Sequence, residues 1–174
     1  MKVLGDGSNC FPFLKLLAKL PIKKYWKHVL NWNKVCSTKI ARKGKYLLSY
    51  IIYLDFDFTH FVSEHETSIE NWLETVQRYG TEGMTTRELY DFRWQTNLFS
   101  TEDIGMIVNR SVMVEHLHPP NGMTAIVVND AVQYSLAKIY ALQTRNHEKL
   151  PDVKVFFALG EAIAWLGDDV SKCL

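Results

Sequence analysis

Runs of hydrophobic residues with a strand-like pattern begin near Leu47. The first run, LLSYIIYL, is rich in β-branched and aromatic residues, and a second run, FTHFV, follows a polar break at residues 55–57. Two such runs separated by a short break are typical of an antiparallel hairpin. The sequence therefore predicts that the ordered part of the chain begins with a β-hairpin.

The segment TSIENWLETVQRYG, at residues 67–80, changes to a helical period. Its apolar residues recur every three or four positions, which predicts an amphipathic helix. Thr67 and Glu70 fit a capping box at its start, and Gly80 suits its C-terminal stop. The apolar stripe consists of Ile69, Trp72, Leu73, Val76 and Tyr79.

A second strand and helix follow in the same way. RELYDF is short and apolar-interleaved, and it predicts the third strand. Ser100 can cap the next helix together with Asp103, and the sequence HPPNG at 118–122 then marks a loop. The buried stripe of this helix is predicted to be Ile104, Ile107 and Val108.

The C-terminal third contains two more strands and two more helices. TAIVVN is a near-continuous apolar run, as expected for a parallel strand covered on both faces. Asp130 begins a helix in which Gln133 is placed to complete a capping box, and VKVFFAL predicts the last strand. The final helix, EAIAWL, lies between Gly160 and Gly167. The stripe of the Asp130 helix is predicted to be Val132, Leu136, Ile139 and Tyr140.

The predicted order of elements is ββαβαβαβα. This order indicates one α/β domain with a mixed sheet of about five strands and about four helices, joined by right-handed crossovers.

Charge divides the chain into two unlike parts near residue 45. Residues 1–45 hold eleven of the 20 Lys and Arg residues but only one of the 19 acids, whereas residues 46–174 hold nine bases and 18 acids. We therefore assign residues 1–45 to a basic N-terminal extension, either disordered or a spurious leader, and residues 46–174 to the α/β domain. The acidic domain is not expected to bind nucleic acid.

Cysteine usage and hydropathy indicate a cytoplasmic protein. The three cysteines, Cys10, Cys36 and Cys173, are far apart and form no disulfide framework. No apolar run approaches the roughly 20 residues that a membrane-spanning helix needs. Phe11, Phe13, Trp26 and Trp32 accompany the basic residues of the extension, so contact of residues 1–45 with an anionic membrane is an alternative.

ELYDFR ahead of a Ser-capped helix, TAIVVND, and the closing VKVFFALGEAIAWLG together resemble a known family. They are similar to small bacterial proteins with the STAS-like fold, that of the SpoIIAA-like anti-sigma-factor antagonists and, more remotely, of lipid-binding CRAL-TRIO modules. The resemblance covers about residues 47–167, and its specific marks are Asp91, Arg93 and the closing pattern of strand, Gly, Glu, Ala and Trp-Leu. It implies fold more than activity.

The resemblance also implies a phosphoacceptor position. Antagonists with this fold carry a Ser or Thr in a turn before the second helix, and placing that turn on FSTEDIG puts Thr101 at the acceptor position. Glu102 and Asp103 would repel an added phosphate. The alternative is that Ser100 only caps the helix.

Polar residues at strand ends are the candidate binding site. Asp91 and Arg93 are two residues apart at the end of a strand, where open α/β sheets place ligands. Trp94 follows them, and Asn129 and Asp130 end the neighbouring strand. They form either a binding site for a small ligand or an ion pair, a packed tryptophan and a helix cap.

Motifs for catalysis or metal binding are lacking. His116 and His118 form an H-x-H that we interpret as solvated loop histidines rather than ligands. The sequence has no G-x-S-x-G and no Gly-rich phosphate loop. We therefore expect no catalytic residue, metal or cofactor.

The sequence favours a non-enzymatic STAS-like regulatory module in a bacterial cytoplasm. It would bind a partner protein, another copy of itself, or a small apolar ligand. One alternative is a lipid or metabolite carrier with an enclosed pocket, and another is an enzyme that uses Asp91 and Arg93.

Overall fold

The computed structural model describes residues 39–42, 48–63 and 66–174. In these residues six strands form one sheet, in the order β1-β2-β3-β4-β5-β6. The strands are β1 (Lys39–Arg42), β2 (Leu48–Tyr53), β3 (Phe58–Ser63), β4 (Arg87–Asp91), β5 (Met123–Val127) and β6 (Asp152–Phe156). The α-helices are α2 (Ile69–Glu82), α3 (Thr101–Met113), α4 (Ala131–Thr144) and α5 (Leu159–Leu166).

From β2 onward the order of elements is ββαβαβαβα, which confirms the predicted α/β fold with five strands and four helices. β2 and β3 form the antiparallel hairpin, and β3 to β6 run parallel. β1 is an additional strand that pairs antiparallel with β2. The sheet thus includes residues that the charge pattern assigned to the N-terminal extension.

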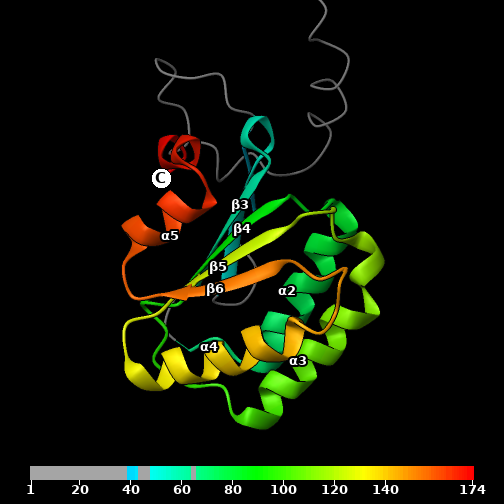
Figure 1. Ribbon diagram of the computed structural model, residues 1–174, viewed down its shortest axis with the longest axis vertical. Coiled ribbons are helices and arrows are strands. Elements are labelled where there is room, and N and C mark those ends of the chain that lie inside the picture. Colours follow the sequence, from blue (N-terminus) through cyan, green and yellow to red (C-terminus); the bar gives the residue numbers. More distant parts are fainter. Residues whose placement is uncertain (1–38, 43–47, 64–65) are drawn as a thin grey trace, which may run out of the picture. The chain divides into compact units, whose positions relative to one another are not determined.

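The larger core lies between the sheet and α2, α3 and α4, which cover one face (Figure 1). Side chains at one level of the strands form a continuous row across this face, because the strands are paired in register. The row consists of Tyr50, Phe61, Tyr90, Ile126 and Val155, all buried.

The smaller core lies on the opposite face, under α5 (Figure 1). Alternate residues of the strands point to this side, as the two-residue period of a strand requires. Arg87 at the start of β4 forms an ion pair with Asp169 at 2.7 Å, which ties the 3-10 helix Asp168–Lys172 to the sheet. The core residues include Phe58, Leu89, Val127, Ala162 and Leu166.

Both ends of α2 differ from the prediction. Ser68, not Thr67, is the N-cap and accepts a hydrogen bond from the Asn71 amide at 3.3 Å. The Thr67 hydroxyl is instead buried against Ser63 Oγ at 2.7 Å. The helix continues past Gly80 to Glu82 and stops at Gly83, whose φ of 103° is unfavourable for residues with a side chain.

The Ser100–Asp103 capping box of α3 is confirmed, and so are its buried residues Ile104, Ile107 and Val108. In α4 the Asp130 cap is confirmed, but Val132 is 55% exposed, so its assignment to the buried stripe was wrong. The helix approaches the sheet through Ala137 and Ala141 instead. Small residues allow this close approach.

Glu88 is a buried acid in the larger core. It lies on β4 and is 4% exposed, and its Oε2 accepts a hydrogen bond from Thr124 Oγ1 at 3.1 Å. Burial raises the pKa of the Glu88 carboxyl to about 7, although hydrogen bonds from Thr124, Tyr79 and Tyr90 act in the opposite direction. The folded protein therefore holds this proton more tightly than the unfolded chain does.

We predict that replacing Glu88 with Gln changes how the free energy of unfolding depends on pH. The stabilisation from a raised carboxyl pKa is present below the unfolded value of 4.5 and is lost as the pH rises through about 7. Gln keeps the shape of the side chain without its charge. The free energy of unfolding of the variant minus that of the wild type should therefore increase by about 2 to 3 kcal/mol between pH 5 and pH 8.

Urea unfolding at several pH values measures this difference. The titration of His60 is common to both proteins and cancels in the comparison. Parallel stability curves for the two proteins would show that Glu88 does not hold its proton through neutral pH.

Candidate functional site

The carboxyl ends of the parallel strands, where open α/β sheets bind ligands, are joined to the helices by short loops. The loop from β4 to α3 is the longest of these, at residues 92–100. Gln95, in its middle, is only 6% exposed. A buried amide needs hydrogen-bond partners, and these partners come from the end of β3 and from the same loop.

The Gln95 amide and backbone connect β3, the β4–α3 loop and α4. Ser63 Oγ donates to Gln95 Oε1 at 3.0 Å, and Gln95 Nε2 donates to the Asn97 carbonyl at 2.9 Å. Gln133 Nε2 donates to the Gln95 carbonyl at 2.9 Å, and Asn97 Nδ2 donates to the Thr67 carbonyl at 2.9 Å. This Gln95 network fixes the loop relative to the sheet.

Asp91 and Arg93 form the ion pair that their spacing predicts. Arg93 Nε and Nη2 donate to the two Asp91 carboxylate oxygens at 2.9 and 2.8 Å. Burial raises the Asp91 pKa, but the hydrogen bonds and the charge of Arg93 outweigh it and hold that pKa below its ordinary value. Because both oxygens are engaged and the carboxyl stays ionised, the geometry is that of a structural ion pair.

His60 shares the electrostatic environment of this ion pair. Burial lowers the pKa of its imidazole to about 4, while the Asp91 charge acts to raise it and the Arg93 charge to lower it. His60 Nε2 is buried and has no hydrogen-bond partner among the described residues. The imidazole is therefore neutral at physiological pH.

The other predicted site residues are only partly brought together. Asn129 Nδ2 donates to the Arg93 carbonyl at 2.7 Å, so these two strand ends meet as expected. Asp130 is occupied as the cap of α4, where its Oδ1 accepts from the amides of Val132 and Gln133. The Gln133 side chain accepts from Asn129 N, so it does not complete the predicted capping box.

Trp94 and Thr101 lie outside the network. Trp94 is 63% exposed, which does not fit the interpretation that it packs against the following helix. Thr101 is the exposed first residue of α3, next to the Ser100 cap. Its use as a phosphoacceptor stays a prediction.

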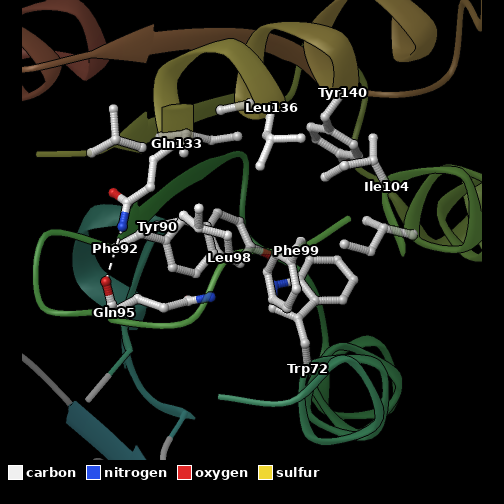
Figure 2. A pocket seen from close by; sticks show the side chains of 14 residues that line it. Trp72, Tyr90, Phe92, Gln95, Leu98, Phe99, Ile104, Gln133, Leu136 and Tyr140 are labelled. Carbon is white, nitrogen blue, oxygen red and sulfur yellow. Dashed lines mark hydrogen bonds between the residues drawn. The ribbon is translucent and has the colours of Figure 1, made fainter. Parts of the chain in front are cut away.

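An apolar cavity lies between the sheet, α2, α3, α4 and the 92–100 loop (Figure 2). Its space is about 60 Å³, open on one side. Five aromatic side chains form much of its wall: Trp72, Tyr90, Phe92, Phe99 and Tyr140. The rest of the lining is aliphatic except for Gln95 and Gln133, which are joined by the hydrogen bond drawn in Figure 2.

The sequence pattern did not predict this cavity. Trp72, Ile104 and Tyr140 were correctly assigned to the apolar stripes of helices. Such a stripe does not show whether the side chains of neighbouring elements fill the space between them or leave a cavity. The buried role of Gln95 could have been suspected from one feature of the sequence, a glutamine within a loop that is rich in apolar residues.

The described residues contain no group of three or more His, Cys, Asp or Glu placed to hold a metal ion. Among the described helices, none combines the length and apolar character needed to cross a bilayer. Cys173 is buried and not in a disulfide, whereas Cys10 and Cys36 lie outside the described residues.

Comparison of the sequence with protein-family models and with curated proteins gives no match. The STAS-like resemblance therefore stays a prediction. The structure supports only the α/β fold with a mixed sheet.

We predict that Asp91 and Arg93 stabilise the fold as a coupled pair. The Asp91 side chain is 5% exposed and that of Arg93 is 33% exposed. A double-mutant cycle with Asp91→Asn and Arg93→Gln, measured by urea unfolding, should give a coupling of about 0.5 to 2 kcal/mol. Additive effects of the two substitutions would contradict this.

We also predict that the Gln95 network stabilises the domain. Gln95→Met has nearly the same shape but removes the partners of Ser63 Oγ and the Asn97 carbonyl, so the free energy of unfolding should fall by about 1 to 3 kcal/mol. Gln143→Met, on the exposed side of α4, is the matched control and should change it by less than about 0.5 kcal/mol. If both substitutions changed the free energy of unfolding equally, the stabilising role of Gln95 would be contradicted.

Proposed function

We propose that this domain is a non-enzymatic, cytoplasmic binding module that takes a small, largely apolar ligand into the cavity beside the 92–100 loop. The observation that carries the proposal is the cavity itself, which lies at the carboxyl edge of the sheet and has an aromatic wall. Apolar pockets with a few fixed polar groups are the usual form of small-molecule sites.

Size limits the ligand. A water-sized group needs roughly 10 to 15 Å³ of such space, so about 60 Å³ accommodates roughly four or five non-hydrogen atoms. A lipid chain would require several hundred cubic ångströms. The cavity thus fits a small molecule, or the compact end of a longer one, better than the enclosed lipid of a carrier.

A partner protein, or a second copy of the chain, is the second candidate. Trp94, Val132 and Phe157 follow the carboxyl ends of β4, β5 and β6, and each is more than half exposed. Large exposed apolar residues on one edge of a sheet are a common feature of protein interfaces. This surface fits the regulatory role that the STAS-like resemblance implies.

We predict that 3,3-dimethylbutan-1-ol, a neutral probe with a compact tert-butyl group, binds saturably to the protein. Ala137 lies on α4 in the cavity wall, and Ala137→Leu places three further carbon atoms into the space. This substitution should weaken binding at least tenfold, about 1.4 kcal/mol. Methyl NMR titration measures both affinities.

Ala131→Leu is the matched control, because Ala131 lies on the same helix but is exposed. It should leave the affinity unchanged. Equal binding by the wild type and both variants would place the probe outside the cavity. Native mass spectrometry of the purified protein separates the two candidates, since a co-purified small molecule favours the cavity and a dimer without one favours the exposed edge.

A further inference from the structure

Glu88 lies on the same face of β4 as Tyr90, one level further from the carboxyl edge. Tyr90 and Tyr140 both line the cavity, and the Glu88 charge contributes to raising the pKa of each tyrosine. Glu88 is thus not part of the cavity wall itself, but it lies two residues from Tyr90 on the same strand and is hydrogen bonded to the Tyr90 hydroxyl. A charge on Glu88 is felt in the cavity because little water separates them.

Glu88 has no cationic partner among the described residues. The groups that hydrogen bond to it are hydroxyls, those of Thr124, Tyr79 and Tyr90. None of the ion pairs between described residues includes it. An ionised carboxyl in this place is an uncompensated negative charge inside the core.

The cavity wall also favours a positive charge. Five aromatic side chains line the cavity, and aromatic rings attract cations that lie over their faces. The lining includes no Lys, Arg or His. The aromatic wall and the buried carboxyl of Glu88 therefore act in the same direction.

Hydrogen-bonding capacity decides which kind of cation fits. The two amides of the lining are already engaged, Gln95 with Ser63 and Asn97, and Gln133 with Asn129 and the Gln95 carbonyl. A metal ion would need several oxygen ligands, and a primary ammonium would need acceptors for its three N–H groups. A fully alkylated ammonium needs neither.

We infer that the cavity recognises the alkylated ammonium head of a small organic cation, with Glu88 as its buried counter-charge. This inference rests on the proposed function, because it names the class of ligand for the same cavity. A trimethylammonium group with its attached carbon has five non-hydrogen atoms, which matches the space of about 60 Å³. The open side leaves room for the rest of the ligand.

The groups around Glu88 allow its titration to be followed. Tyr79 on α2, Tyr90 on β4 and Tyr140 on α4 face it, and burial raises the pKa of all three, so they stay neutral between pH 6 and pH 8. β5 contributes the Thr124 hydroxyl. Glu88, whose pKa is about 7, is the titrating member of this cluster.

The test compares choline with 3,3-dimethylbutan-1-ol, which has the same shape but a carbon atom in place of the charged nitrogen. At pH 8 the full-length protein should bind choline at least tenfold more tightly, as measured by methyl NMR titration. Glu88→Gln should reduce this preference to less than threefold. Glu74→Gln, on the exposed side of α2, is the matched control and should keep it.

The pH dependence of the wild type is an independent measurement if Glu88→Gln fails to fold. Choline affinity should rise by up to about tenfold from pH 6 to pH 8 as Glu88 ionises, while the affinity for the neutral probe stays constant. Equal affinity for both compounds would overturn the inference but leave the proposed function standing. Binding of neither compound would overturn both.

Discussion

The burial of one amide, that of Gln95, determines the arrangement of the carboxyl edge. A side chain that is 6% exposed must find partners within the protein, and the Gln95 amide finds them in Ser63 Oγ and the Asn97 carbonyl. Gln133 Nε2 adds a hydrogen bond to the Gln95 backbone carbonyl. These bonds hold the 92–100 loop in place between the ends of β3 and α4. Phe92 and Phe99 of that loop then form part of the cavity wall, so the cavity depends on this network.

Local patterns in the sequence predicted most of the fold. The strands have continuous or alternating apolar runs, and Ser100 and Asp103 form a capping box that involves residues close in sequence. Where two neighbouring residues can fill the same role, the local pattern did not predict which of them does so. Thr67 and Ser68 can both cap a helix, and the choice depends on Ser63, which bonds the Thr67 hydroxyl.

The site was less predictable because its contacts are long-range. Ser63 and Gln95 are 32 residues apart, and Gln95 and Gln133 are 38 residues apart. The helical period predicted that Val132 is buried and did not single out Ala137. How closely α4 packs on the sheet depends on the size of the side chains that face it, which the spacing of apolar residues does not show. The Asp91–Arg93 pair was predictable, because the two residues are only two apart in the sequence, at the end of β4 and the start of the following loop.

The Gln95 network and the aromatic wall surround one cavity, and Glu88 is buried near it. We propose that small ligands enter this cavity between the sheet and α2, α3 and α4. Intermolecular nuclear Overhauser effects from the tert-butyl protons of 3,3-dimethylbutan-1-ol test this proposal most directly. We expect them to reach the methyl groups of Ile104, Ile107, Ile126 and Leu136 in the cavity wall. Contacts only to exposed methyl groups, such as those of Leu142 on the outer side of α4, would contradict it.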